Sequence, residues 1–147
     1  MRVFLTTTIA TADRVCRDGF TNMHQLSDVE GVYLADAQLD ANDGFEGPVT
    51  LCLDVPDDVF QKYEWVEDGL GYRHAVIPAE VLNRLPRPQV YDHLFAGCSR
   101  RQMVQAIRRR EHAGSVGYPS VQDMRDAMAF FDRIGWLTPV RLSEGGE

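Results

Sequence analysis

The sequence predicts an α+β protein, in which strands fill the first part of the chain and helices fill the second. Short runs of β-branched and aromatic residues, bounded by glycine and proline, recur before residue 78. After residue 98, apolar residues recur at helical spacing behind two serines that can cap helices. The 147 residues are enough for one domain with a sizeable hydrophobic core.

The chain begins with a predicted strand and helix. Residues 2–8 are rich in β-branched and aromatic side chains, which favour a strand. The helix after it is expected to begin at Thr8 or Thr11 and to end at Gly19. Residues 20–30 are polar and irregular, and they predict a surface loop.

The central stretch, residues 31–36, has the sequence Gly-Val-Tyr-Leu-Ala-Asp and predicts a short buried strand. Asp36 can cap a short helix or turn, which the turn-forming residues 42–44 can close. Tyr33 then either forms one wall of a pocket or is a core aromatic residue whose hydroxyl finds one partner. Another strand is expected over residues 48–56, where alternate apolar side chains share one face.

Shorter elements are expected next. Asp57 and Asp58 favour the start of one or two helical turns, because acidic side chains stabilise a helix N-terminus. Residues 64–70 allow a short strand and a turn. A further strand is expected over residues 72–77, and one helical turn should begin at Pro78.

The second part of the chain is predicted to be helical. The segment Leu85-Pro-Arg-Pro88 indicates a boundary between an α+β core, residues 1–84, and a C-terminal helical extension, residues 85–147. One helix is expected after Ser99, where a capping-box pattern occurs, and a second after Ser120. The extension is expected to pack on the core as part of one compact domain.

Charge is unevenly distributed along a chain whose net charge is -7. Residues 1–98 carry 7 basic and 16 acidic side chains, whereas residues 99–147 carry 8 basic and 6 acidic ones. The acidic part would repel a polyanion, so nucleic acid is a poor partner for it. The three cysteines are widely spaced, and no apolar run approaches the roughly 20 residues that cross a bilayer. These features predict a cytoplasmic protein with reduced thiols and no membrane partner.

Few polar residues have the spacing of a metal or phosphate site. His24, His93 and His112 are isolated, which predicts surface positions. The three aspartates around Pro56 are expected to be a solvated helix start rather than metal ligands, namely Asp54, Asp57 and Asp58, and no glycine-rich phosphate loop occurs.

His74 is the most informative of the four histidines. Strand alternation places its side chain on the same face as Tyr72 and opposite Arg73. It is either a half-buried histidine bonded to backbone or a residue of a pocket.

Four stretches together resemble the ADP-ribosyltransferase fold of the poly- and mono-ADP-ribosylating enzymes. Residues 2–20 are similar to the strand and helix with which that family begins, and residues 31–36 to its glycine-Φ-tyrosine-Φ-alanine-aspartate strand, where Φ is apolar. Residues 49–56 and 72–78 resemble the strands that follow, and Ala41-Asn42 resembles the small-residue helix after the tyrosine strand. The four stretches are residues 2–20, 31–36, 49–56 and 72–78. The resemblance covers residues 1–83 and implies split antiparallel β-sheets with flanking helices.

The resemblance implies that the chain binds NAD between two small sheets and transfers ADP-ribose with loss of nicotinamide. In the family a histidine holds the ribose, a tyrosine stacks on the nicotinamide, and a glutamate steadies the cation-like transition state. Tyr33 occupies the tyrosine position, Leu5 the histidine position and His74 the glutamate position. The implied catalytic residues are therefore His74 and Tyr33, and the implied cofactor-binding residues are Thr6, Thr7, Tyr33, Asn42 and Tyr72.

The two replaced positions predict that the usual transfer reaction is lost. A leucine side chain offers no hydrogen bond, although the hydroxyl of Thr6 beside it can donate one. Neutral His74 can accept a proton, but a protonated imidazole would repel a developing positive charge. Alternatively, a glutamate near His74 in the sequence supplies the missing carboxylate, and the three that qualify are Glu64, Glu67 and Glu80.

A row of arginines on the first tail helix is the expected partner surface, and its members are Arg100, Arg101, Arg108, Arg109 and Arg110. They either form salt bridges with the acidic body or bind an acidic partner or nucleic acid. The sequence thus predicts an ADP-ribosyltransferase-like protein that binds NAD or a related nucleotide. The alternative is a catalytically inactive copy of that fold whose basic tail binds such a partner.

Overall fold

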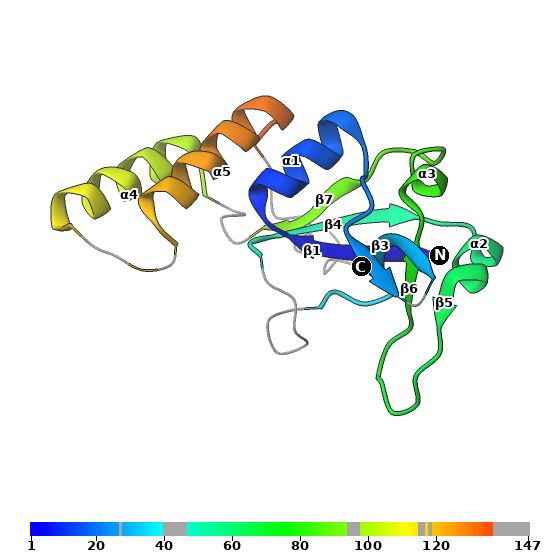
Figure 1. Cartoon of the computed structure of the whole chain (residues 1–147). Helices are drawn as coiled ribbons and strands as arrows, with labels where there is room; N and C mark the ends of the chain where they lie inside the picture. The colour runs from blue at the N-terminus through cyan, green and yellow to red at the C-terminus, as the bar shows by residue number, and fades with distance from the viewer. Residues whose placement is uncertain (27, 40–46, 94–97, 115–116, 118, 137–147) are drawn as a thin grey trace, which may run out of the picture. The chain divides into compact units, whose positions relative to one another are not determined.

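The computed structural model describes residues 1–26, 28–39, 47–93, 98–114, 117 and 119–136, and Figure 1 shows its elements. Seven strands and five helices lie within these residues, which confirms the α+β class. The chain divides into two compact units, Met1–Tyr91 and Asp92–Glu147. The sequence placed the boundary after residue 84, ahead of the last strand, whereas this division falls within that strand.

The first unit is built on one sheet with the strand order β5-β6-β3-β1-β4-β7, and β2 pairs with the outer part of β3. Every strand pair with a defined register is antiparallel. The strands are β1 (Arg2–Thr7), β2 (His24–Leu26), β3 (Val29–Ala35), β4 (Val49–Asp54), β5 (Glu64–Trp65), β6 (His74–Ile77) and β7 (Gln89–His93).

The two central strands of the sheet, β1 and β3, pair with each other over a very short length. β1 pairs with β4 along its whole length, from Arg2 to Thr7. β3 pairs with β6 through four consecutive residues, Val32 to Ala35. Between β1 and β3, in contrast, the register contains the single pair Phe4 and Ala35. Two half-sheets, β5-β6-β3-β2 and β1-β4-β7, are therefore joined through a short central contact.

Alternation along the strands gives the sheet two chemically different faces. The registers place buried apolar side chains on one face: Val3, Leu5, Val32, Leu34, Val49, Leu51, Leu53, Ala75 and Ile77. The opposite face carries hydroxyl, thiol, aromatic and imidazole groups: Phe4, Thr6, Tyr33, Thr50, Cys52 and His74. The first face contributes to the hydrophobic core, and the second holds the polar residues that matter for function.

Three helices complete the first unit. α1 (Ile9–Asp18) packs against β4 and buries Ile9, Ala12 and Val15 (Figure 1). Its N-cap is Thr8, whose hydroxyl accepts the Thr11 backbone N–H, and it ends at Gly19 with φ 99°. α2 (Asp57–Tyr63) and α3 (Ala79–Leu82) follow prolines, as expected.

The second unit contains two helices, α4 (Arg100–Ala113) and α5 (Val121–Ile134). Complete capping boxes begin both helices, at the two serines that the sequence predicts as caps. Their buried apolar residues are Met103, Ile107, Met124, Ala127, Phe130 and Phe131. Two ion pairs join the helices, Arg125–Glu111 at 2.9 Å and Arg100–Asp132 at 3.0 Å. The hairpin is thus held by apolar packing inside and by charge pairs at its surface.

Several expectations about local structure were wrong. Residues 20–30 are not one loop, because β2 lies inside that segment and β3 begins at Val29. The polar sequence of β2 gives no strand pattern, and its strand character comes from pairing with β3. β7 was also not predicted. His93 was expected at the surface, yet it is buried against two phenylalanine rings.

Other expectations fall partly outside the described residues. Asp36 and Ala37 form a bend rather than the start of a helix, and residues 40–46, which include Asn42, are not among the described residues. Within the described part of the chain, no helix is both long enough and apolar enough to cross a membrane.

Candidate functional site

Tyr33 and His74 form a hydrogen-bonded pair on the polar face of the sheet. Tyr33 on β3 lies opposite Val76, and His74 on β6 lies opposite Ala35, so the two are diagonal neighbours on one face. The Tyr33 hydroxyl oxygen lies 2.5 Å from Nδ1 of His74, and the ring planes meet at 80°. His74 is buried, with 7% of its surface exposed, whereas Tyr33 is half-buried. The His74 side chain is therefore enclosed by protein, whereas Tyr33 keeps part of its surface exposed.

The direction of this hydrogen bond determines the form of the imidazole. With Nδ1 unprotonated, the Tyr33 hydroxyl donates to it and the ring proton of neutral His74 lies on Nε2; with Nδ1 protonated, the ring N–H donates to the hydroxyl oxygen. Nε2 is buried and has no hydrogen-bond partner among the described residues. Its nearest charged neighbour is the Glu67 carboxylate, with 3.8 Å between Nε2 and Oε2. That separation is too long for a hydrogen bond but suits an ion pair once the imidazole is charged.

Other aromatic rings surround the pair. The Tyr72 ring lies 5.9 Å from the His74 ring and nearly perpendicular to it. The His24 ring lies 6.1 Å from the Tyr33 ring. Trp65 is directly opposite His74 in the β5–β6 register and is 43% exposed. Together these rings give one face of the half-sheet an aromatic surface that suits a flat heteroaromatic ligand.

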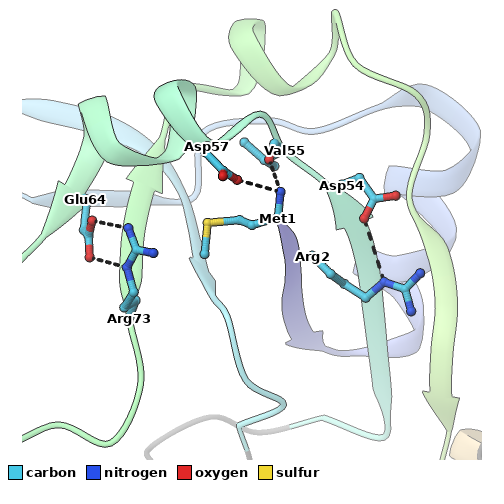
Figure 2. Close-up of polar contacts among 7 residues, drawn as sticks. All are labelled: Met1, Arg2, Asp54, Val55, Asp57, Glu64 and Arg73. Atoms are coloured by element: carbon cyan, nitrogen blue, oxygen red, sulfur yellow. Dashed lines mark hydrogen bonds and ion pairs between the residues drawn. The ribbon is translucent and has the colours of Figure 1, made fainter.

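The structure distinguishes the three glutamates that the sequence left as alternatives. Glu64 accepts two hydrogen bonds from the Arg73 guanidinium, at 2.9 and 2.7 Å, as Figure 2 shows. This hydrogen-bonded guanidinium lowers the pKa of Glu64, and the same pairing raises the pKa of Arg73. Glu80 is paired with Arg84 at 3.1 Å. Glu67 is therefore the one of the three whose carboxylate is placed against His74.

Two of the acidic residues around Pro56, Asp54 and Asp57, form surface ion pairs. Asp57 lies 3.1 Å from the Met1 amino group, which also donates to the Val55 carbonyl, and Asp54 lies 3.8 Å from Arg2 (Figure 2). In the described part of the chain, no three His, Cys, Asp or Glu side chains are grouped so as to hold a metal ion.

Thr6 lies on the same face as Tyr33, but its hydroxyl serves the protein itself. It donates to the Leu39 carbonyl at 2.8 Å and lies 3.1 Å from the Thr50 hydroxyl. The Gln38 side-chain amide donates to Thr50 at 3.2 Å. This network fastens the segment after β3 to the β1–β4 half-sheet. Thr6 thus positions that segment and presents no free hydroxyl of the kind the sequence suggested.

The remaining predicted residues are dispersed. Thr7 lies on the opposite face from Thr6, because neighbouring strand residues alternate. Leu5 points into the core with 6% of its surface exposed. The structure therefore brings together three of the predicted residues, Tyr33, His74 and Tyr72. It adds His24 and Trp65, which the sequence did not assign to this site, and it identifies Glu67 as the glutamate nearest His74. Only the β2–β3 and β5–β6 registers could have revealed the first two.

Basic side chains gather on α4 in the second unit. Arg100 bonds to Asp132, whose pKa is lowered by the hydrogen bond from Trp136 and by that from Arg100. Arg101, Arg108 and Arg109 are exposed and form no ion pair with any described residue. Arg101 and Arg108 lie on one side of the helix, since two turns separate them. This row of three arginines is the part of the predicted basic surface that remains available to a partner.

Comparisons with known proteins returned no relative. No protein-family model matches the chain, and no curated protein or solved structure matches it at a significant level.

Proposed function

We propose that the first unit is an ADP-ribosyltransferase-like domain that binds NAD or a related nucleotide beside Tyr33. The proposal combines the sequence resemblance with two features of the sheet.

The first supporting feature is the short contact between β1 and β3. An ADP-ribosyltransferase-like fold requires two small sheets that meet and then separate, and here the half-sheets share only the Phe4–Ala35 pair. The segment after β3 is fastened to the other half-sheet through Thr6 and Thr50. The stretch that resembles the family's tyrosine strand therefore ends at the residue pair that joins the two half-sheets.

The second feature, which carries the proposal, is the position of the Tyr33–His74 pair. Tyr33 is on the strand predicted to present the stacking tyrosine, and His74 takes the place of the family's glutamate on the neighbouring strand. The exposed Trp65 ring lies beside them. These rings offer stacking surfaces for a nicotinamide or an adenine, and the imidazole can hydrogen-bond to a ribose.

Transfer is expected to be slow compared with binding. A glutamate stabilises a cation-like transition state through its charge, and a neutral imidazole supplies no such charge. The proposed activity is therefore nucleotide binding with weak release of nicotinamide.

The proposal is tested by titrating the chain with NAD in a calorimeter and by measuring nicotinamide release. Tyr33→Ala should abolish binding, whereas Tyr63→Ala, at the end of α2, is a matched control that should leave it intact. Equal binding by wild type and Tyr33→Ala would reject the proposed site, and absence of binding to the wild type would reject the function.

A second function is favoured by the arginine row on α4. Three exposed arginines without ion pairs among the described residues suit an acidic partner or nucleic acid. In that case the sheet would be a catalytically inactive copy of the fold and the second unit would carry the activity.

This alternative predicts salt-sensitive binding to a nucleic acid probe. Replacing Arg101, Arg108 and Arg109 by Ala should remove it and should lower the slope of log affinity against log salt by about three. A triple Ala variant of Arg2, Arg17 and Arg84, which are ion-paired, is the charge-matched control. Equal loss in both triple variants would indicate net charge rather than a site.

A further inference from the structure

We propose that Tyr33, His74 and Glu67 form a hydroxyl–imidazole–carboxylate relay that removes a proton from the hydroxyl group of an acceptor, water included. In this relay Tyr33 contacts the acceptor, while His74 and Glu67 act through Tyr33 as positioning residues. The inference rests on the proposed function for the identity of the donor nucleotide, but the relay itself is a property of the protein alone.

The three groups lie in the order that a relay requires. The Tyr33 hydroxyl contacts Nδ1 of His74, and Nε2 on the other side of the same ring faces the Glu67 carboxylate. His74 is buried, so water does not compete for its ring nitrogens, whereas Tyr33 is half-buried and Glu67 is 57% exposed on its side chain. The relay requires an acceptor to reach the tyrosine oxygen through the part of Tyr33 that is exposed.

The buried Nε2 atom is the observation that connects His74 to Glu67. A buried polar atom without a hydrogen bond is unfavourable, and among the described side chains Nε2 of His74 and Nε2 of His93 are in this state. The Glu67 carboxylate lies 3.8 Å from this atom, so it is placed to form an ion pair with the imidazolium that results when His74 accepts a proton at Nδ1.

The proton movements balance without any further reactant. The acceptor O–H bond breaks as its oxygen attacks the ribosyl carbon, and its proton passes to the Tyr33 oxygen. The Tyr33 hydroxyl proton passes at the same time to Nδ1 of His74. The C–N bond to nicotinamide breaks, and its electron pair leaves with nicotinamide. At the end Tyr33 is neutral, His74 is an imidazolium that faces Glu67, and loss of its proton to solvent restores the starting state.

Other charged and titratable groups near His74 have different partners. Arg73 is held by Glu64 and lies over the Phe60 ring, on the side of the sheet away from Tyr33. The Glu64 carboxylate senses His74 electrostatically but is occupied by that guanidinium. Tyr72 contacts the His74 ring edge-on. Glu67 thus remains the carboxylate that can respond to the charge on His74.

The relay is tested first in the protein without ligand, by two-dimensional NMR that correlates histidine ring nitrogens with ring protons. The expected result for wild type is a single tautomer of His74 with the proton on Nε2. Tyr33→Phe should abolish this preference, and Glu67→Gln should shift the Nε2–H resonance. Glu80→Gln, an exposed glutamate paired with Arg84, is the matched control and should shift nothing. A proton on Nδ1 in wild type, or equal spectra for Glu67→Gln and Glu80→Gln, would overturn the relay.

The second arm measures nicotinamide release from NAD in water. Glu67→Gln should lower kcat by about 10-fold or more with little change in KM, Glu67→Asp should restore part of the loss, and Glu80→Gln should match wild type. If wild type binds NAD but all three variants release nicotinamide equally, the relay is wrong and the proposed function stands. If wild type binds no NAD, the proposed function fails and the NMR result alone decides the relay. Because Glu67 is exposed, its variants should fold normally.

Discussion

Burial of His93 makes the stability of the second unit depend on pH. His93 is 4% exposed, and its ring lies 4.4 Å from the Phe131 ring and 6.4 Å from the Phe130 ring, between centroids. Burial among apolar rings disfavours the charged imidazole and lowers the pKa of His93 from 6.5 to about 4, although the neighbouring Asp92 partly opposes the shift. The folded protein therefore holds His93 neutral at a pH where the unfolded chain protonates it.

The sign and size of the effect follow from proton linkage. Between pH 6.5 and pH 4 the unfolded chain binds more protons than the folded one, so the stability that depends on neutral His93 is fully present above pH 6.5 and is lost as the pH falls. With a folded pKa of about 4, the loss between pH 7.5 and pH 5 is about 2 kcal/mol. That is a large fraction of the stability of a small unit.

The assay is urea unfolding at pH 7.5 and pH 5 for wild type, His93→Leu and the control His112→Leu, which changes an exposed histidine at the end of α4. Fluorescence of Trp136 reports on the same unit, because its ring lies 5.0 Å from Phe131, and a Trp65→Phe background removes the other tryptophan. His93→Leu should reduce the pH dependence by about 2 kcal/mol relative to wild type. An equal pH dependence in all three proteins, or titration of His93 near pH 6.5, would refute the reasoning.

Three further predictions concern the fold that holds the site. Gly31→Ala should destabilise the first unit by about 2 kcal/mol in urea unfolding, because a Cβ at Gly31 would overlap the backbone of Ile77; Gly71→Ala, where nothing lies within 4 Å, should have no comparable effect. Ser99→Ala should destabilise the second unit by about 1 kcal/mol through loss of its capping box, and an unchanged midpoint would contradict the cap. Glu64→Gln should make the stability of the first unit less sensitive to acid. Pairing with Arg73 lowers the pKa of Glu64, so the stabilisation from the pair is present above the ordinary pKa of a glutamate and disappears as the pH falls through the lowered pKa. Acid titrations that coincide for wild type and variant would show that the pair does not matter.

Local patterns predicted most helices and the central strands, because those signals lie within a few consecutive residues. Ser99 and Ser120 could be assigned as N-caps from their position before an apolar repeat, and the structure confirms both; of the two candidates for the first helix, Thr8 and Thr11, the structure selects Thr8. β2 and β7 could not be predicted, since their side chains have no strand pattern and pairing alone makes them strands. The burial of His93 could not be predicted for a similar reason, because it depends on contacts with phenylalanines of α5, which are distant in the sequence.

The candidate site was predictable to the extent that it depends on strand alternation. The juxtaposition of Tyr33 and His74 follows from two strands that neighbour each other with the correct register, and the sequence contains one signal for each strand. Glu67 could not be selected by distance along the chain, because Glu80 is nearer to His74 in the sequence and Glu64 is only three residues further away than Glu67. The three glutamates are distinguished only in the folded chain, where Arg73 pairs with Glu64 and Arg84 pairs with Glu80.

The geometry of the pair is set by the core beneath it rather than by the hydrogen bond itself. Shifting β3 against β6 by one residue would move every side chain of one strand to the other face, and His74 would lose its position diagonal to Tyr33. Such a shift would expose apolar residues of the buried face, where Leu34 pairs with Ala75. Gly31 opposes it as well, because only a residue without a Cβ fits against Ile77 at that place. The glycine of the central motif therefore fixes the register, and the register places the tyrosine hydroxyl on the imidazole.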